Sequence, residues 1–321
     1  MSFNRNFGIE LEFKGLSFEQ SATALRAAGI RVNIEGYNHN DHHDDAWKLV
    51  PDSSVRDGHE LVSPVLCGHD GLKTAIRAAI AIERAGARVD ISCGFHVHFD
   101  AHDLTANDVR TICKRYMKHE AIIDAMMPAS RRGNSNQYCR SLTTCFADNR
   151  EFEEAEYINM LARAQGHRYF KVNLQAFGRH GTIEFRQHSG TVDSSKIAYW
   201  ILFLNAFIEE SVRISRKGGS VSASSSSALR GREKELVEFL TGGAKSADEI
   251  AASFGVSYRS VASIVRDARK HGVAIRTGRL NAKTFYSVMA DAHAEDNDGL
   301  FDGVDDGIRA FYEIRSMNFA A

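Results

Sequence analysis

Residues 8–13 (GIELEF), 94–100 (GFHVHFD) and 182–186 (TIEFR) decide the fold expected for this chain. Side chains two residues apart point to the same face of a β-strand. Each segment therefore has one apolar face and one face of ionisable groups. If the three strands pair in one sheet, the apolar faces form a core. The opposite face then collects Glu10, Glu12, His96, His98, Glu184 and Arg186.

Carboxylates and imidazoles bind divalent cations, and a guanidinium binds phosphate. Two glutamates on one strand face repel each other unless a cation lies between them, so Glu10 and Glu12 favour a metal site over a solvent-facing strand. His96 and His98 bind a metal, bind phosphate or accept structural hydrogen bonds, and the sequence does not decide which of them contacts metal. Glu184 and Arg186 also fit a simple salt bridge.

Further candidates lie near these strands in the sequence. Residues 47–64 supply Glu60 as a metal ligand and a turn with Asp52 and Ser54, which either contacts substrate or only shapes the turn. Residues 168–175 are predicted to pair with 181–187. The basic and amide groups expected beside the metal site or the substrate are Arg168, Lys171, Asn173, Arg131 and Arg140. Arg131 and Arg140 fall in an irregular stretch and also fit ordinary surface arginines. The run 39–45 (HNDHHDD) fits either a metal site or a flexible lid.

The element pattern predicts an α+β fold with a largely antiparallel sheet. We expect strands at 7–13, 30–34, 47–50, 59–63, 94–100, 168–175 and 181–187, and helices at 17–28, 70–85, 105–126, 150–163 and 193–213. The Gly/Ser-rich residues 215–228 have the composition of a linker. This divides the chain into a catalytic domain (1–214), the linker (215–228) and a C-terminal region.

Residues 229–290 are predicted to form three helices followed by a β-hairpin, the order of a winged helix-turn-helix. They carry 11 basic and 6 acidic side chains, a net charge of +5. The basic residues of the third helix and of the hairpin are Arg259, Arg266, Arg269, Lys270, Arg276, Arg279 and Lys283. The charge and the element order favour DNA binding over a protein-contact module. Residues 291–321 are expected to form an acidic connection and a short docking helix.

The chain has 321 residues, and its 43% hydrophobic content is that of a soluble globular protein. It has no apolar run of membrane-spanning length, and the polar first residues lack the apolar part of a signal peptide, so we expect a cytoplasmic location without membrane contact. The 5 cysteines are irregularly spaced, which favours reduced thiols. Cys93 and Cys139 lie beside candidate site residues, and buried filler is favoured over a nucleophile. The oligomeric state stays open.

The segments GIELEF, WKLVPDSS with ELVSPVL, GFHVHFD, and RYFKVNLQAFGRHGTIEFRQHSGT together resemble the putative amidoligase family over about residues 7–210. That family is related to glutamine synthetase and glutamate–cysteine ligase, the carboxylate–amine ligases. The resemblance implies a curved antiparallel sheet with helices on its outer face. It also implies ATP and Mg²⁺ or Mn²⁺ ions on the concave side, and joining of a carboxyl group to an amine.

By this resemblance, the metal ligands would be Glu10, Glu12, Glu60, Glu184 and His96. Arg186 would hold ATP phosphate oxygens, with Lys171, Arg168, Asn173 and His98 beside it, and Arg186, Glu184 and His96 would be the catalytic groups. Asp52, Ser54, Arg131 and Arg140 would contact the carboxylate or amine substrate, a small molecule or a peptide. The C-terminal module lies outside the shared region.

Two other functions fit parts of the pattern. A zinc-dependent hydrolase could use the same histidines and glutamates without ATP. A non-enzymatic DNA-binding regulator could use the N-terminal domain to sense a ligand. Retention of all four candidate glutamate ligands favours an enzyme over this regulator.

Overall fold

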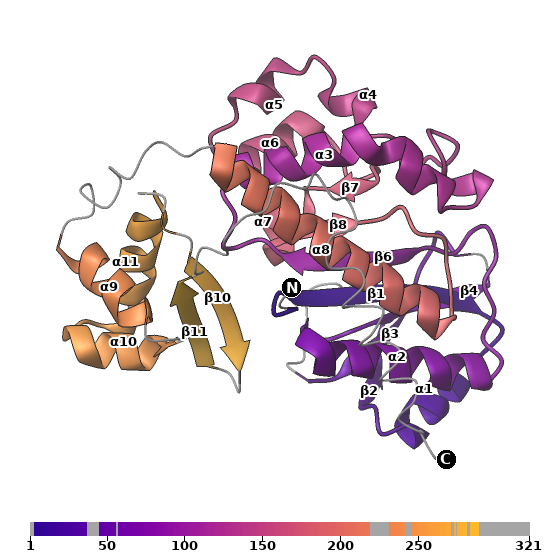
Figure 1. Cartoon of the computed structure of the whole chain (residues 1–321). Coiled ribbons are helices and arrows are strands. Elements are labelled where there is room, and N and C mark those ends of the chain that lie inside the picture. Colours follow the sequence, from indigo (N-terminus) through magenta and orange to yellow (C-terminus); the bar gives the residue numbers. More distant parts are fainter. Residues whose placement is uncertain are drawn as a thin grey trace. The chain divides into compact units, whose positions relative to one another are not determined.

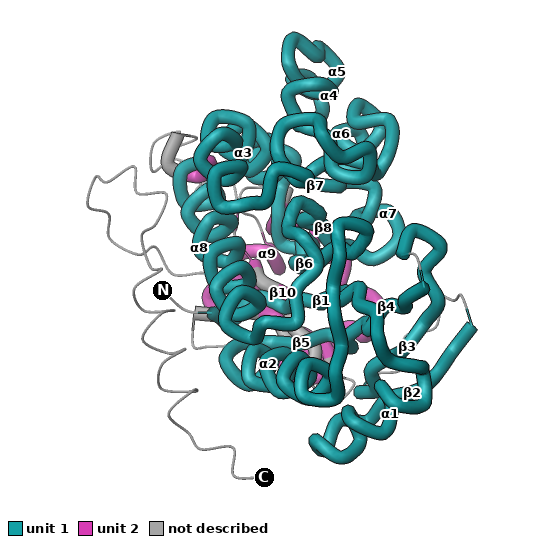
Figure 2. The backbone as a smooth tube through the Cα atoms, turned by 90° about the vertical axis from the view of Figure 1, so that its right-hand side faces the viewer, with its two compact units in different colours: residues 1–214, 299–321 teal, residues 215–298 magenta. Residues whose placement is uncertain are grey.

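The computed structural model describes residues 3–36, 45–55, 57–218, 231–241, 245–270, 273, 275–280 and 283–288. These residues form two compact units, one of residues up to 214 and one of residues from 215 onward (Figure 2). The predicted segments 39–44, 219–228 and 291–321 lie outside the described residues.

The first unit is built on an eight-stranded sheet (Figure 1). Its strand order is β2-β3-β4-β1-β6-β8-β7, and β5 pairs separately with β1. All neighbours are antiparallel except β2 and β3, which are parallel. The strands are β1 (Asn6–Lys14), β2 (Val32–Ile34), β3 (Trp47–Pro51), β4 (Gly58–Val62), β5 (Leu66–Cys67), β6 (Phe95–Asp100), β7 (Val172–Asn173) and β8 (Thr182–Phe185). The predicted α+β class is confirmed, and the sheet is mixed.

Helices α2, α3 and α8 lie on one side of this sheet (Figure 2). Their apolar side chains form a single core with the apolar strand residues, among them Phe13, Phe99 and Phe185. The helices of this unit are α1 (Phe18–Ala27), α2 (Gly68–Arg84), α3 (Ala106–Ala125), the 3₁₀ turn η1 (Ala129–Arg131), α4 (Thr143–Phe146), α5 (Arg150–Glu154), α6 (Ile158–Gln165), α7 (Ala176–His180) and α8 (Ser194–Gly218). None of the described helices combines the length and apolar character that a membrane crossing needs.

Local sequence explains where two of these helices begin. Ser17 and Gln20 form a reciprocal capping box at the start of α1, and Thr105 and Asp108 form another at the start of α3. Each pair satisfies two backbone N–H groups that the first turn of a helix leaves without partners. The second capping box thus fixes the start of α3 at Ala106, a short loop after β6 and its His-Val-His motif.

Three predicted elements differ in the structure. The helix expected at 150–163 is two short helices, because the side chain of Arg110 binds the carbonyl oxygens of Phe152 and Ala155 and ends α5. The strand expected at 168–175 is reduced to β7, since residues 169–171 bind partly to Arg140. Helix α8 continues to Gly218, so residues 215–218 are helical rather than linker, with Ser215 on a buried side.

The second unit contains α9 (Arg232–Thr241), β9 (Lys245–Ser246), α10 (Ala247–Phe254), α11 (Tyr258–Lys270), β10 (Ile275–Leu280) and β11 (Lys283–Val288). The strands form an antiparallel sheet in the order β10-β11-β9. A separate core joins the helices to the sheet through Leu236, Ile250, Val261, Val265, Ile275 and Tyr286. The structure therefore has the predicted order of three helices and a hairpin, with one additional short strand.

Candidate active site

Strand β1 lies between β4 and β6, and its register brings the predicted ligands into adjacent pairs. Glu12 lies opposite Glu60, and Glu10 lies opposite His96. On the next strand pair, His98 lies opposite Glu184. We call the sheet face that carries these side chains the polar face. Because alternate side chains point to opposite faces, it lies across the sheet from the helix-covered core.

The centre of the polar face is Glu10 with the two histidines. His96 Nδ1 lies 3.0 Å from Glu10 Oε2, and His98 Nε2 lies 3.2 Å from Glu10 Oε1. Burial alone would raise the pKa of Glu10, but the charges and hydrogen bonds of His98 and His96 lower it overall. Burial works against the charged form of His98, yet Glu184 and Glu10 raise its pKa. The interaction between Glu10 and His98 therefore favours the charged form of each group.

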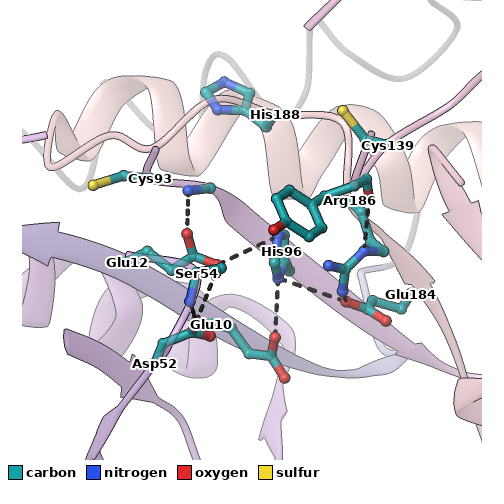
Figure 3. Close-up of polar contacts among 12 residues, drawn as sticks. Glu10, Glu12, Asp52, Ser54, Cys93, His96, Cys139, Glu184, Arg186 and His188 are labelled. Carbon is teal, nitrogen blue, oxygen red and sulfur yellow. Dashed lines mark hydrogen bonds and ion pairs between the residues drawn. The ribbon is translucent and has the colours of Figure 1, made fainter. Parts of the chain in front are cut away.

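Glu184 adds a second carboxylate to this group. Its Oε1 lies 3.6 Å from His96 Nδ1 and 3.8 Å from His98 Nε2. Arg186 donates to Oε1, and the amide of Asn173 donates to Oε2. Burial opposes ionisation of Glu184, but Arg186 and His98 outweigh it and lower its pKa. Figure 3 shows His96 between Glu10, Glu12 and Glu184.

A second carboxylate group lies beside the first. Glu12, Asp52 and Glu60 can each offer an oxygen within 4.8 Å of the other two. Burial raises the pKa of Glu60 well above its usual range, and the neighbouring carboxylates of Glu10, Glu12 and Asp52 raise it further. Burial also raises the pKa of Glu12. Protonation or a bound cation would relieve this repulsion.

The chemistry of these donors fits a divalent cation. Two further groups, Glu10 with His98 and Glu184, and Glu10 with Glu60 and His96, place their potential ligand atoms within the same 4.8 Å limit. Oxygen Oε2 of Glu60 is buried and has no hydrogen-bond partner among the described residues. A buried carboxylate oxygen without a partner is costly, and a metal ion would supply one.

Arg131 also reaches the polar face, from η1. Its Nη2 donates to the carbonyl of Cys93 at 2.6 Å, and its buried Nε has no partner in the part of the chain that the structure describes. The backbone N–H of Gly94 donates to Glu12 Oε2 at 2.6 Å. A Cβ at Gly94 would lie 2.7 Å from His96 Nε2 and 3.4 Å from Arg131 Nη2. Glycine before the His-Val-His motif therefore lets Glu12, His96 and Arg131 meet.

Other predicted residues are placed differently. Lys171 is fully buried, and its ammonium donates to Glu120 and Asp124, both at 2.6 Å. Arg168 is exposed, with its guanidinium carbon 5.4 Å from the ring centre of Tyr169, and the side chain of Arg140 is exposed. Their predicted contacts with ATP or substrate stay predictions. Ser54 donates from its N–H and hydroxyl to Asp52, each at 2.6 Å, which holds the turn.

The cysteines near the site are structural in character. Cys93 and Cys139 are buried, and burial raises the pKa of both thiols. A thiol with a raised pKa is a poor source of the nucleophilic thiolate. This agrees with the filler interpretation of both residues.

The structure adds two carboxylates that the sequence did not place at the metal site or beside it. Asp52 is predicted to contact substrate or only to shape its turn, and it also lies with Glu12 and Glu60 as a potential metal ligand. Asp124 in α3 accepts from Lys171, Gln187 and the N–H of Gly133, so it ties three segments beside Arg131 and Arg186. The turn pattern of residues 52–54 could have indicated Asp52, whereas no local signal indicates Asp124.

The match to known families covers the whole sheet and its site. A family model described as putative amidoligase enzyme matches residues 3–208. The chain belongs to this family. A search of curated proteins found no match to the chain. Membership of the putative amidoligase family supports an amide-forming ligase with small-molecule substrates, and the second unit lies outside the matched region.

Proposed function

We propose that the protein is an ATP-dependent carboxylate–amine ligase that forms an amide bond through an acyl phosphate, on a glutamine synthetase-like sheet. The observation that carries this proposal is the cluster of buried carboxylates on the polar face. Within the described residues, Oε2 of Glu60 in this cluster has no hydrogen-bond partner, and guanidinium groups lie beside the cluster. This cluster supplies the metal and phosphate binding that phosphoryl transfer from ATP requires.

Glu10, Glu12, Glu60, Glu184 and His96, with Asp52 as an addition, would hold Mg²⁺ or Mn²⁺. All of them lie in the three groups whose potential ligand atoms are within 4.8 Å, as does His98. Carboxylate oxygens are the ligands these ions prefer. The ions would neutralise charge on the phosphate oxygens of ATP.

Arg186 and Arg131 are the residues best placed to bind phosphate. In the described part of the chain, Arg186 donates to Glu184 and to the carbonyl of Tyr138. A guanidinium has five N–H groups, so donors remain for a phosphate. The Nε of Arg131, which no described residue accepts from, is a further donor. Both residues would stabilise the negative charge of the transferring phosphoryl group.

The reaction would proceed in two displacements. A substrate carboxylate oxygen attacks the γ-phosphorus, the bond to ADP breaks, and an acyl phosphate forms. The amine nitrogen then attacks the acyl carbon, inorganic phosphate leaves, and the nitrogen loses its proton. The buried setting of Glu12, His96 and Glu184 would help exclude the water that hydrolyses an acyl phosphate.

ADP release tests the proposal. A screen of carboxylate and amine pairs with Mg²⁺ or Mn²⁺ identifies a productive pair. Glu10→Ala and Glu184→Ala should then lower metal-dependent ADP release at least about 100-fold while the fold is retained. Glu154→Ala is the matched control, because Glu154 is an exposed glutamate at the end of α5. Normal turnover in either site variant would overturn the assignment.

The two alternative functions give different results. A zinc hydrolase would be stabilised against thermal unfolding by Zn²⁺ and unaffected by Mg-ATP. A non-enzymatic regulator would bind DNA in a salt-sensitive manner without releasing ADP. Stabilisation by Mg-ATP together with ADP release supports the ligase alone.

We also propose a second function, DNA binding by the second unit, whose element order is that of a winged helix. In α11, Val261, Val265 and Ala268 are buried, whereas Arg259 and Arg266 are exposed seven residues apart. This spacing places both arginines on one helix face. Arg269 instead donates to Ile275 O and Thr277 Oγ1, which ties α11 to β10. The side chains of Lys270, Arg276, Arg279 and Lys283 lie outside the described residues.

Equilibrium binding to duplex DNA at several salt concentrations tests this second function. The double variant R259Q/R266Q should bind more weakly and show a smaller salt slope, because two phosphate contacts are lost. Arg150→Gln, an exposed arginine of α5, is the control. Unchanged affinity and slope in the double variant would exclude α11 as the DNA-binding helix.

A further inference from the structure

Lys48 is a buried lysine on the polar face that the proposed reaction does not use. It lies opposite Val62, which in turn lies opposite Glu10, so the three residues form one row across β3, β4 and β1. Its neighbours Trp47 and Leu49 point into the helix-covered core. By strand alternation, Lys48 points to the same face as Glu10. Only 5% of Lys48 is exposed.

The ammonium of Lys48 is incompletely paired. Among the described residues its recorded ion pair is with Glu35, at 3.8 Å between Nζ and Oε2. This distance is longer than a hydrogen bond. Glu35 follows β2, and its N–H donates to Leu49 O, so its position beside β3 is held by the backbone.

The fully buried Lys171 is an example of a lysine whose ammonium is well hydrogen-bonded. It donates to two carboxylates, both at 2.6 Å. A buried charge is costly unless it is paired and hydrogen-bonded. Lys48 is nearly as buried but lacks such bonds within the described residues. Its three donors are therefore suited to an anion that arrives with a ligand.

The position of Lys48 indicates which part of a ligand it meets. Arg186 directly follows β8, two strands from β1 on one side, and Lys48 lies on β3, two strands from β1 on the other. With neighbouring strands about 4.8 Å apart, the backbones of Lys48 and Glu10 are roughly 10 Å apart. A phosphate held by Arg186 and by a cation on Glu184 would lie across β1 from Lys48.

We propose that Lys48 binds a second carboxylate of the substrate, one that does not react, and that the protein therefore selects dicarboxylic acids, including acidic amino acids, over monocarboxylic ones. This rests on the proposed ligase function, in which the first carboxylate lies at the metal and phosphate groups. Val62 lies between the two positions in the row, and the carbon chain of the substrate passes over it.

Ligand binding with defined probes tests this proposal without a known amine substrate. Glutarate and L-glutamate carry two carboxylates, and butyrate carries one. In the presence of Mg²⁺ and a non-hydrolysable ATP analogue, calorimetry should show glutarate or L-glutamate binding at least about tenfold more tightly than butyrate, the size expected for a hydrogen bond between charged groups.

Lys48→Met should remove this preference, and Lys48→Arg should retain part of it. Lys48→Met removes one charge of the Lys48–Glu35 ion pair, so the double variant K48M/E35Q, which removes both charges, provides a second folded form to test. Lys73→Met is the control, since Lys73 is an exposed lysine of α2. All variants should bind the nucleotide and Mn²⁺ like the wild type.

The outcomes separate this proposal from the ligase function. Unchanged dicarboxylate preference in Lys48→Met, or no preference in the wild type, overturns the role of Lys48 while nucleotide and metal binding leave the ligase intact. Loss of nucleotide affinity in Lys48→Met, with dicarboxylate binding retained, would assign Lys48 to phosphate and also overturn the proposal. Absence of nucleotide and metal binding in the wild type would overturn the ligase function itself.

Discussion

The two faces of the eight-stranded sheet come from the same strands but differ in what stabilises them. On one face, Phe13, Phe99 and Phe185 pack against helices, and burial of apolar surface favours folding. On the other, Glu12, Glu60 and Glu184 are almost as buried, and burial opposes their charge. Burial of the apolar face therefore offsets the unfavourable free energy of burying the carboxylates of the binding site.

Phe185 and Glu184 are adjacent in β8 and point to opposite faces of the sheet, so variants of the two residues test directly how much each face contributes to stability. Phe185→Ala should lower the free energy of unfolding by about 3–5 kcal/mol, because Phe185 is fully buried between Phe99 and Tyr116. Glu184→Ala should cost less: it breaks the ion pair with Arg186, but it also removes a buried charge and its repulsion with Glu10. Urea unfolding of the two variants measures both values. A larger loss for Glu184→Ala would mean that the polar face contributes the greater stability.

The ion pairs of Lys171 show that a buried charge can also be fully satisfied. Lys171→Met should lower the free energy of unfolding by about 3–4 kcal/mol, because Glu120 and Asp124 lose their cation. Nucleotide affinity of the folded variant should stay unchanged. Lys114→Met is the control, because Lys114 is an exposed lysine of α3, the helix that contains Glu120 and Asp124. Near-normal stability with weaker ATP binding would instead place Lys171 at the nucleotide, as the sequence predicted.

His188, shortly after β8, shows how burial of one imidazole makes the stability of the protein depend on pH. Burial lowers its pKa from 6.5 to about 4, and its ring lies against Phe95 and Trp200. Between pH 6.5 and 4 the unfolded chain binds the proton and the folded chain does not. Its contribution to stability is therefore complete above about pH 6.5 and lost as the pH falls towards 4, by roughly 3 kcal/mol.

His188→Phe should flatten the decrease in stability over this pH range. Urea unfolding at pH 7, 5.5 and 4 measures the difference between the variant and the wild type. Parallel pH profiles for the two proteins would show that His188 titrates normally in the folded state.

The smallest expected effect concerns Glu60, whose carboxylate is expected to bind a cation but to destabilise the metal-free protein. Glu60→Gln should raise the stability of the metal-free protein by on the order of 1 kcal/mol, because a carboxylate repelled by Glu10, Glu12 and Asp52 is removed. It should also weaken Mn²⁺ binding about tenfold or more. Thermal unfolding with and without Mn²⁺ measures both. A metal-free variant less stable than the wild type would show that Glu60 acts in packing rather than in binding.

Much of the fold and of the site could be predicted because strand alternation is a local property. The pattern of GIELEF, GFHVHFD and TIEFR placed the apolar residues in the core and the ionisable residues on the other face, and the sheet contains all three strands. Which strands become neighbours depends on pairings between residues far apart in the chain. The sequence did not show that β1 would lie between β4 and β6, which is what unites Glu12 with Glu60 and Glu10 with His96.

The α+β class, the two chemically different sheet faces and the identity of the ionisable groups follow from residue type and local periodicity, so the amino-acid sequence alone specifies them. The pairing of those groups depends on the three-dimensional arrangement of the strands and helices. This arrangement gave Lys171 two carboxylates, left Lys48 with a long ion pair, and placed Asp52 with Glu12 and Glu60. Burial and the distances between groups on different strands set these outcomes, and no local pattern encodes them.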